Sequence, residues 1–523
     1  MSGCNIGQEL NDHSWVDAQL KLRDAIRSWI HSAIRRQEGS PWKGGHDEAN
    51  YTISWTDYYL LSGDERVKAF LLWLRDSYRA WSAENEYHGF RADARDYVTH
   101  SFENHMGFIA ALCEMDPSDP VNNALIEHVA HHIGNWEDGV PDWYDWNRHQ
   151  LVAHWLGTRE VRNYPPWNFT TTRHARVARL ALKAYQTSGN QRYLDWCDDF
   201  LCRWCDEILA AKDRIPINLY LTPPDQTTDE QWAQTPHPDA YRDPYQGNRW
   251  AGAIHEILRL MFEAYAYIPN DRYLEAVKKA LSLCERVAAG KANMMTGVIT
   301  TMLAYQGLTR DTRYAERIDT WRREYLVPRL DGAIDGPMPD MLIGPLDGGR
   351  KAFGIDAGDG TIRVYDGPRA SEYKMGYDAG GKMCYLTRAM QMAERCLALS
   401  AAWVRDGREH GCGAAKYIHG EGAAAAGALR ACTGLEHLLY YGVEDRPGLA
   451  EDVAVLAKGE PTDLALGLLN TATEKRLVGI RARHQNKRIE AARSNAARVE
   501  LADGKAKVEL APGAAARLVL SVK

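Results

Sequence analysis

The chain has 523 residues, with 63 Lys and Arg against 70 Asp and Glu, which gives a formal net charge of −7. This balance lacks the basic excess that binding to nucleic-acid phosphates requires, so nucleic acid is not an expected partner. With 45% hydrophobic and 25% charged residues, the composition is that of a globular protein and excludes a disordered or collagen-like chain.

The amino-terminal region and the cysteines bear on location and chemistry. No run of about 18 apolar residues occurs, so a membrane is not an expected partner. Residues 1–16 have neither the basic nor the apolar region of a signal peptide. The cysteines mostly fall in helix-like apolar stretches, and the pair Cys202 and Cys205 has no second ligand pair at zinc-site spacing. We therefore expect reduced, buried thiols, no metal and no cofactor. The expected location is cytoplasmic, or periplasmic or secreted if a signal peptide has been removed, and the oligomeric state stays open.

Aromatic usage is unusual, with 17 Trp and 26 Tyr against 8 Phe. Indole and phenol rings combine a flat apolar face with a polar group, which suits stacking on the C–H face of a sugar. Large helical proteins also pack Trp between helices. Composition leaves both explanations open.

A short phrase recurs along the chain and predicts the architecture. It reads LSGDERV at 61–67, TSGNQRYL at 187–194, IPNDRYL at 268–274 and LTRDTRYA at 308–315, with a degenerate copy at 116–122. Each copy separates two stretches of helical periodicity, and its central Asp or Asn is a typical helix N-cap. We expect each copy to be the tip of a helical hairpin.

The predicted helices form successive pairs. In each pair the first helix is rich in Ala, Gly, Met and Leu on several faces, and the second is amphipathic. This difference favours a ring with buried inner and half-exposed outer helices: a mainly α (α/α)6 or (α/α)7 toroid of helical hairpins. The pairs are 50–62 with 65–82, 99–115 with 120–134, 171–187 with 190–211, 248–267 with 270–289 and 292–307 with 311–326, followed by helices at 379–405 and 421–441.

Two segments depart from this pattern. Residues 329–378 are too rich in Gly, Asp and Pro for a helix, and we expect a long loop excursion over the cleft. From residue 443 onward, apolar and polar residues alternate with period two, and ADGK at 502–505 is a hairpin turn signal. The expected domains are a toroid catalytic domain at 1–442 and a small antiparallel, β-sandwich-like domain at 443–523.

The loops that precede the first helices gather polar and aromatic residues. In a ring of hairpins these loops meet at one end, where free N–H groups and helix dipoles attract anions. All six loops contain Tyr and five contain His: 41–59, 84–105, 163–176, 235–256, 365–380 and 416–422.

This combination of a hairpin toroid, a β tail and loops with His, Tyr, Asn and Arg resembles the toroid-type polysaccharide lyases, which include alginate, glucuronan and glycosaminoglycan lyases. The resemblance implies β-elimination at a uronic acid of an acidic oligo- or polysaccharide. A neutralising group holds the carboxylate, a base removes the C5 proton and an acid protonates the leaving O4. In such lyases Tyr and His commonly transfer the protons, and Asn, Arg, His or Glu neutralise.

The segment DPYQGNRW supplies groups of these kinds within six residues. Tyr245 is the expected proton carrier, Arg249 and Asn248 the expected neutralisers, and Trp250 a stacking platform. Each of them is alternatively a capping or surface residue.

Two other loops place polar groups at the start of an inner helix. Asn104 and His105 open the second inner helix, and Arg173 and His174 open the third. We expect catalytic roles for these four, with a core histidine or a cap as the alternative.

The remaining expected substrate contacts come from the same set of loops. Gly420 and Gly422 flank one of them and would permit close approach of a ligand, although glycine before a helix is also an ordinary cap. These contacts are Trp55, Trp167, Asn168, Tyr373, His419 and Glu421.

Two other functions compete with a lyase. A glycoside hydrolase needs two carboxylates, one of them with a raised pKa. A non-catalytic carbohydrate-binding protein would use the aromatic residues for stacking alone. The carboxylates near inner-helix starts are Asp57, Asp93, Asp96, Glu103 and Glu421. The run HVAHH at 128–132 falls on an outer helix, where surface or packing roles are expected.

Overall fold

The structure is a computed structural model. It describes residues 13–37, 55–93, 99–235, 241–245, 254–288, 292–346, 350–380, 382–405, 412–442, 446–460, 463–483, 487–494 and 498–522. The chain divides into two compact units. The terminal unit contains residues 1–41, 50–73 and 319–523, and the middle unit contains residues 42–49 and 74–318.

The hairpin tips predicted from the recurrent phrase are present. At four tips a carboxylate or amide oxygen accepts a hydrogen bond from a backbone N–H in the first turn of the next helix, which satisfies a group that has no partner inside the helix. At the fifth tip, Asp311 accepts from the Arg313 N–H in the turn just before the next helix. The acceptors are Asp64, Asp119, Asn190, Asn270 and Asp311. The local phrase therefore predicted the turns correctly.

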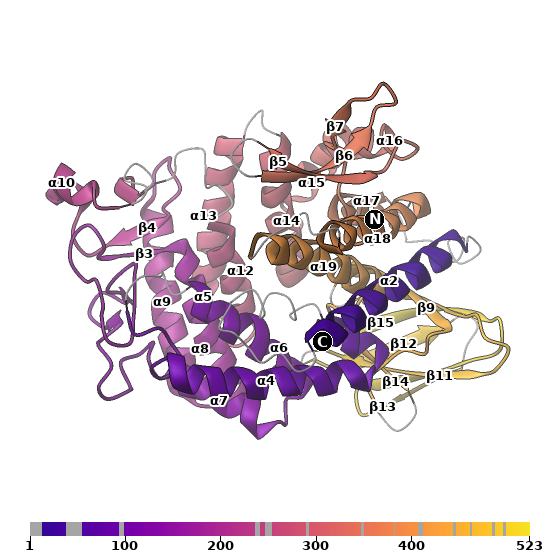
Figure 1. Cartoon of the computed structure of the whole chain (residues 1–523), viewed down its shortest axis with the longest axis horizontal. Coiled ribbons are helices and arrows are strands. Elements are labelled where there is room, and N and C mark those ends of the chain that lie inside the picture. Colours follow the sequence, from indigo (N-terminus) through magenta and orange to yellow (C-terminus); the bar gives the residue numbers. More distant parts are fainter. Residues whose placement is uncertain are drawn as a thin grey trace. The chain divides into compact units, whose positions relative to one another are not determined.

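The middle unit is built from helical pairs and short strands (Figure 1). Helix α8 packs on α7 and α9, and α9 also packs on α13. The elements of the middle unit are most of α4 (Glu65–Asn85), α5 (Thr99–Phe102), η1 (Glu103–Ile109), α6 (Ala110–Met115), α7 (Pro120–Ala130), β1 (Tyr144–Asp145), β2 (Gln150–Leu151), β3 (Phe169–Thr171), η2 (Thr172–His174), α8 (Ala175–Ser188), α9 (Gln191–Ala210), β4 (Asn218–Tyr220), η3 (Pro224–Gln226), α10 (Asp229–Trp232), α12 (Ile254–Tyr265), α13 (Asp271–Ala288), α14 (Ala292–Thr309) and the start of α15 (Ala315–Trp321).

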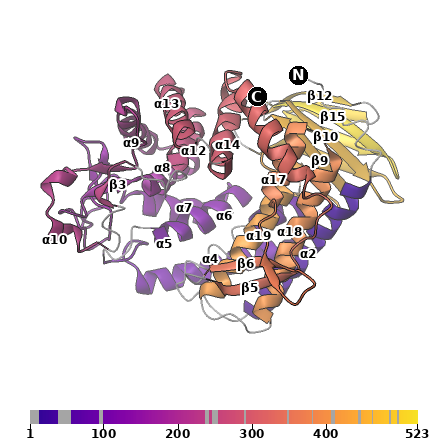
Figure 2. The same ribbon diagram turned by 90° about the horizontal axis from the view of Figure 1, so that it is seen from above.

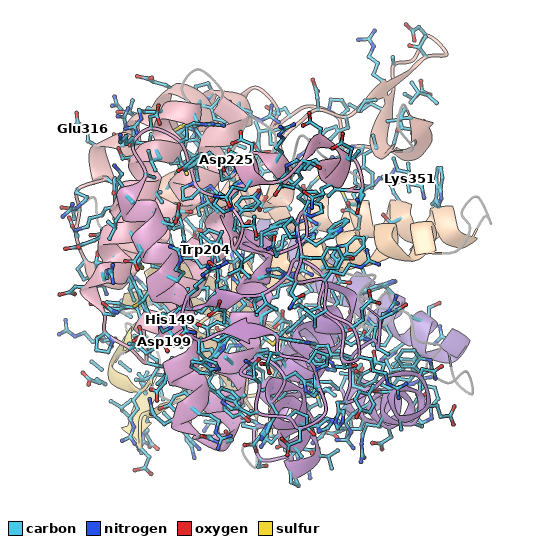
Figure 3. The ribbon with its side chains drawn as sticks, turned by 90° about the vertical axis from the view of Figure 1, so that its left-hand side faces the viewer. His149, Asp199, Trp204, Asp225, Glu316 and Lys351 are labelled. Carbon is cyan, nitrogen blue, oxygen red and sulfur yellow. The ribbon has the colours of Figure 1, made fainter. Side chains whose placement is uncertain are left out.

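Several tryptophan side chains pack in the hydrophobic core of this unit. Trp196 and Trp204 on α9 are fully buried, and Trp196 stacks on Phe200 with ring centroids 5.3 Å apart. Burying each such side chain contributes roughly 2 kcal/mol or more. The β1–β2 hairpin contacts the same helix, because His149 Nδ1 lies 3.6 Å from Asp199 Oδ2 on α9 (Figure 3).

The terminal unit contains long helices and most of the sheet. Its helices are α2 (Ser14–Gln37), a helix at 55–62, the first turns of α4, the end of α15, η4 (Arg322–Leu326), α16 (Val327–Asp331), α17 (Ala370–Gly380), α18 (Met383–Arg405) and α19 (Cys412–Thr433). Its strands are β5 (Met341–Leu346), β6 (Arg350–Asp356), β7 (Ile362–Val364), β8 (Leu438–Tyr441), β9 (Val453–Glu460), β10 (Asp463–Asn470), β11 (Arg476–Ala482), β12 (Ile489–Ser494), β13 (Arg498–Ala502), β14 (Lys505–Leu510) and β15 (Ala515–Val522).

Three features of this unit differ from the sequence-based expectations. Helix α2 was not predicted, although it packs on α18 and α19. The helix predicted at 421–441 ends at Thr433, because Gly434 takes a positive φ of 71° and Leu435 N–H bonds to the Arg430 carbonyl, after which the chain becomes strand β8. The predicted loop excursion contains an antiparallel sheet of order β5-β6-β7.

The carboxyl-terminal strands form two four-stranded antiparallel sheets. One has the order β12-β15-β10-β9 (Figure 2), and the other has the order β13-β14-β11-β8. Buried and more exposed residues alternate along β11, β14 and β15, as they do in a sheet with one covered face. The mainly α class with a small antiparallel β region is thus confirmed.

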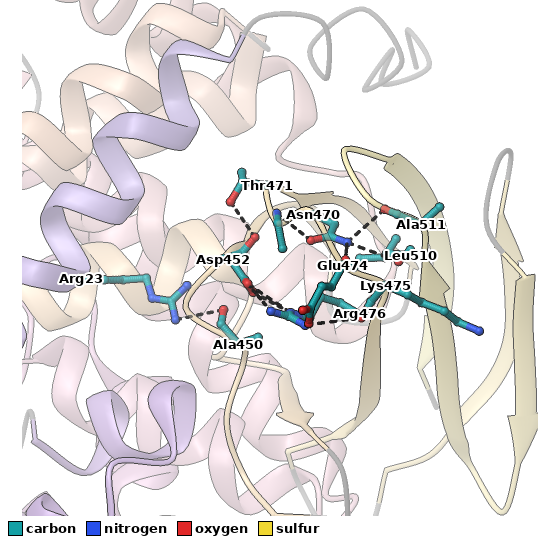
Figure 4. A network of polar contacts seen from close by, with 11 residues as sticks. Arg23, Ala450, Asp452, Asn470, Thr471, Glu474, Lys475, Arg476, Leu510 and Ala511 are labelled. Atoms are coloured by element: carbon teal, nitrogen blue, oxygen red, sulfur yellow. Dashed lines mark hydrogen bonds and ion pairs between the residues drawn. The ribbon is translucent and has the colours of Figure 1, made fainter.

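Helix α2 is bonded to this sheet region. Gln19 exchanges two hydrogen bonds with the Val455 backbone, and Arg23 donates to the carbonyls of Leu449, Ala450 and Val453. Nearby, Asp452 accepts three hydrogen bonds from Arg476 (Figure 4). The domain boundary at 442–443 stays a prediction.

Within the described part of the chain, no helix is long and apolar enough to cross a membrane.

Candidate functional site

A tight turn follows α4 in the middle unit and arranges several polar side chains. Tyr87 and Phe90 pair through two backbone hydrogen bonds, and the residues between them, His88 and Gly89, have φ values of 53° and 79°. Two successive positive φ angles are typical of a type I′ turn, for which glycine is favoured at the second place. A Cβ at Gly89 would also lie 2.7 Å from Val129 Cγ1. The turn therefore needs glycine at this position.

Glu86 precedes this turn and continues one face of α4. Tyr78, Ser82 and Glu86 recur every four residues, so their side chains share that face. Ser82 Oγ donates to Glu86 Oε2 at 2.6 Å, and the Tyr78 hydroxyl lies 3.4 Å from the same oxygen. Burial raises the pKa of Glu86 to about 7, against the opposing influence of both hydrogen bonds and the Arg91 charge. Near neutral pH this carboxyl therefore still carries a proton in part of the molecules, whereas an ordinary carboxyl is ionised.

His105 completes the polar group from the facing π-helical segment η1. The ring is 2% exposed, its Nε2 donates to the Gly89 carbonyl at 2.7 Å, and its Nδ1 lies 3.5 Å from the Tyr78 hydroxyl. Burial lowers the pKa of His105 to about 4, so the ring is neutral at pH 7 with its hydrogen on Nε2. Tyr78 thus stands between a carboxyl and an imidazole acceptor.

The run HVAHH supports the turn from α7. His132 is 1% exposed and its Nε2 donates to the His88 carbonyl at 2.6 Å, which makes it a packing residue as expected. Burial lowers its pKa to about 3. On the turn itself, His88 Nδ1 lies 3.4 Å from Glu137 Oε1. When Nδ1 carries the hydrogen, Nε2 is left as a base, and it has no hydrogen-bond partner within the described residues.

These groups surround a hollow of about 400 Å³, called the Glu86 hollow below. It is bounded by the carboxyl-terminal half of α4, the 86–89 turn, His105 and one face of α7, and Arg79 contributes to its wall. The volume lies near the lower end of the range of roughly 300–1,000 Å³ for small-molecule sites. The lining combines a protonatable carboxyl, a histidine with an available nitrogen and an aromatic ring, Tyr87.

The hollow includes one residue that the sequence singled out, His105. Its neighbour Asn104 is 3% exposed, and its Oδ1 has no hydrogen-bond partner among the described residues. Glu103 is paired with Arg176 on α8, with Nη1 and Oε1 3.3 Å apart. All three lie in η1, and π-helical turns recur at functional sites.

The other expected catalytic residues of the middle unit lie elsewhere. His174 is buried in a capping box, with Nδ1 accepting from the Thr171 N–H and Nε2 3.3 Å from the His154 carbonyl. Arg173 lies beside it in η2. Tyr245 forms a bridge to Pro216, and the Arg214 guanidinium lies 5.4 Å from its ring centroid. Neither His174 nor Tyr245 contacts His105 in the described chain.

Two expected substrate contacts of this unit are held by neighbours. Trp167 is 3% exposed and stacks on Trp155, with centroids 4.3 Å apart. Asn168 Nδ2 donates to Thr222 Oγ1 at 2.8 Å. These partners assign both side chains to packing and loop anchoring in this structure.

In the terminal unit, Trp55 is fully buried and packs against Trp29 and Phe70, so its faces are occupied. Tyr373 is also fully buried and donates to the Ala333 carbonyl, which anchors the loop.

Glu421 is half-buried within α19, and burial raises its pKa against the opposing charge of Arg369. The adjacent Gly422 admits the Trp29 ring and not a ligand, because a Cβ there would lie 2.3 Å from that ring. This corrects the expected reason for the glycine.

Two further carboxylates that were considered for a hydrolase, Asp57 and Asp93, lie in the described chain. Asp57 accepts from Arg430 at 3.1 Å and from Arg483 at 3.0 Å within the terminal unit, which makes it an ion-pair anchor. Asp93 is half-buried. The predictions at Asn248, Arg249, Trp250 and Asp96, and for the side chain of His419, fall outside the described residues.

Sequence reasoning missed Glu86 and His88, although both lie in the loop 84–105 that it singled out. The spacing of Tyr78, Ser82 and Glu86 was visible in the sequence. The burial that raises the pKa of Glu86 was not visible, because it depends on the tertiary packing around the side chain. Among the described residues, no group of three or more His, Cys, Asp or Glu is arranged to hold a metal ion.

Comparison with known proteins gives no family assignment. No protein family matches the sequence, and no curated protein matches it. Among solved structures, a family 76 glycoside hydrolase from a bovine Bacteroides thetaiotaomicron strain has 14% identity and a TM-score of 0.34, covering 53% of this chain and 58% of that one. A GH127 beta-L-arabinofuranosidase from Geobacillus Stearothermophilus T6 has 10% identity and a TM-score of 0.32, covering 97% of this chain and 80% of that one. This chain thus spans less than two thirds of the first of these proteins.

Proposed function

We propose that this chain is a carbohydrate-active enzyme, a glycoside hydrolase, whose proton donor is Glu86. The observation that carries the proposal is a carboxyl with a pKa of about 7 in a hollow large enough for a small ligand. A carboxyl of this kind can protonate a leaving glycosidic oxygen near neutral pH, where an ordinary carboxyl is ionised.

The hydrogen-bond pattern supports this role for Glu86. Ser82 and Tyr78 both donate a hydrogen bond to Glu86 Oε2, whereas Glu86 Oε1 has no hydrogen-bond partner within the described residues. The acidic proton therefore resides on Oε1, at the wall of the hollow. Glu421 also has a raised pKa, but no hydrogen bond from a described residue orients its carboxyl.

The base in this proposal is His88, oriented by Glu137. A water molecule gives its proton to His88 Nε2 as its oxygen attacks the anomeric carbon. The glycosidic C–O bond breaks, and the leaving oxygen takes the proton from Glu86. The 3.4 Å contact between His88 and Glu137 is long, as catalytic hydrogen bonds often are without substrate.

A uronate lyase is the second candidate, and Arg79 is the observation that favours it. This residue contributes to the wall of the same hollow, where its guanidinium would neutralise a uronate carboxylate. His88 would then remove the C5 proton, and Glu86 would protonate the leaving O4.

The test is incubation of the full chain with a panel of neutral and acidic polysaccharides. New reducing ends without ultraviolet absorbance are expected for hydrolysis, whereas absorbance of a 4,5-unsaturated uronate would identify a lyase. Glu86→Gln should lower kcat by a factor on the order of 10²–10⁴. Glu207→Gln, on the surface of α9, is the control and should retain full activity. Undiminished turnover by Glu86→Gln would overturn the assignment, and binding without any product would indicate a carbohydrate-binding protein.

A further inference from the structure

One arginine lines the Glu86 hollow and two others lie beside residues of its wall, in a chain that is acidic overall. Arg79 contributes to its wall. The Arg159 guanidinium lies 4.7 Å from the ring centroid of Tyr87, which belongs to the same wall. Arg91 follows the turn that carries His88 and is close enough to lower the pKa of the Glu86 carboxyl.

The backbone fixes Arg91 and Arg159 relative to the turn. The Thr158 N–H donates to the Arg91 carbonyl at 3.1 Å, and the Arg159 N–H donates to the Ala92 carbonyl at 2.9 Å. Thr158 is fully buried, and a Cβ at Gly157 would lie 2.7 Å from the Ala92 carbonyl oxygen. The backbone segments that carry Arg91 and Arg159 are therefore held together by hydrogen bonds and close packing.

These guanidinium groups are poorly neutralised. Arg91 and Arg159 form no ion pair within the described residues. Arg79 has a contact of 3.7 Å with Asp76 between two half-exposed side chains, and such surface pairs contribute little. Of the two carboxyls beside the hollow, Glu137 faces His88, and the raised pKa of Glu86 reduces its negative charge near neutral pH. The three exposed guanidinium groups therefore have few carboxylate partners of their own and are available to bind an anion.

We propose that the Glu86 hollow takes a sugar that carries an anionic group, a carboxylate or a sulfate, held by Arg79, Arg91 and Arg159. This inference rests on the proposed function and names its substrate class. Guanidinium groups present paired N–H donors that match the oxygens of carboxylate and sulfate. Stacking of Arg159 on Tyr87 presets its orientation, which lowers the entropy lost on binding.

The test measures binding of three methyl glycosides to the wild-type chain by ligand-observed NMR: methyl glucoside, methyl glucuronate and methyl glucoside 6-sulfate. At low salt the anionic glycosides should bind roughly tenfold more tightly than the neutral one, and added salt should reduce this preference. Whichever anion binds more tightly identifies the source of the charge. The double variant Arg91→Gln/Arg159→Gln should lose the preference. The control Arg192→Gln removes an arginine that packs over Trp136 elsewhere in the unit and should keep it.

Equal affinity for all three glycosides, absence of anion binding, or a preference that survives in the double variant would overturn the inference. Different results would contradict the proposed function. A neutral glycan that the wild type cleaves and Glu86→Gln does not would leave the hydrolase standing and remove the anionic substrate. Arginine-dependent anion binding without cleavage of any glycan would support the anionic ligand and contradict the hydrolase assignment.

Discussion

Glu86 in the middle unit and Asp452 in the terminal unit are two carboxyl groups with hydrogen-bond donors around them, yet their pKa values move in opposite directions. Asp452 accepts three hydrogen bonds from the Arg476 guanidinium, which lower its pKa. Glu86 accepts hydrogen bonds only from hydroxyl groups of the described residues, and burial raises its pKa to about 7. The charge of the partner, more than the number of hydrogen bonds, decides whether a carboxyl serves as an anchor or as an acid.

The largest stability effect is expected for Glu86→Gln. The pKa of Glu86 is about 7 in the folded chain against 4.5 as its ordinary value, so the folded state binds this proton more tightly. Wild-type stability therefore falls as pH rises from 4.5 to 7, and the loss is complete above 7. Glutamine has no charge to desolvate, so at pH 8 the variant should be more stable by on the order of 2 kcal/mol, a value reduced for partial exposure.

Urea unfolding of both proteins at pH 4 and pH 8 checks this expectation. The difference between variant and wild type should be small at pH 4 and should appear at pH 8. A variant that is less stable than wild type at pH 8 would show that Glu86 is ionised without penalty.

Asp452→Asn should have the opposite and smaller effect. The ordinary pKa of 3.8 is lowered in the folded chain, so this carboxylate stabilises the fold above about pH 4, and the contribution is lost as pH falls through the folded value. Both side chains are about 30% exposed, and we expect a loss of about 1 kcal/mol at pH 7.

The measurement is urea unfolding at pH 7 and pH 3, with Asp206→Asn as the control. Asp206 pairs with Arg272 between more exposed side chains, so its removal should change stability by a few tenths of a kcal/mol. Equal losses in the two variants at pH 7 would contradict an anchoring role for Asp452.

The smallest effect is expected for Ser82→Ala, which removes the 2.6 Å hydrogen bond to Glu86 Oε2. That bond favours the ionised carboxyl, so its loss raises the pKa of Glu86 further above 7. In a hydrolase that needs the protonated form, the fall of kcat with rising pH should move to higher pH by roughly half a unit.

A pH–rate profile of this variant is compared with one of Ser188→Ala, whose hydroxyl donates to the Ala184 carbonyl and accepts from the Asn190 N–H at the end of α8. If the fall of kcat in Ser82→Ala stays at the wild-type pH or moves to lower pH, the Ser82 hydrogen bond does not lower the pKa of Glu86.

Packing interactions show where sequence reasoning stopped. Helix α2 has buried residues at helical spacing, among them Leu22, Ile26 and Ile30, and this periodicity was readable. It was missed because no hairpin-tip phrase precedes it. Trp55 and Trp167 were expected to stack on sugar, but a sequence does not tell whether an indole face meets a ligand or another ring. In the structure Trp29, Phe70 and Trp155 occupy those faces.

The sequence by itself determined the helical hairpins and their tips, because an N-cap acts on backbone groups two or three residues away. It also determined the alternation of the carboxyl-terminal strands, which is a period-two pattern along one segment. Only the tertiary structure decided which polar groups became chemically distinctive. The pKa of Glu86 and the neutral state of His105 arise from burial by segments up to about 50 residues apart in the chain. Desolvation depends on everything that surrounds a group, and no local pattern encodes it.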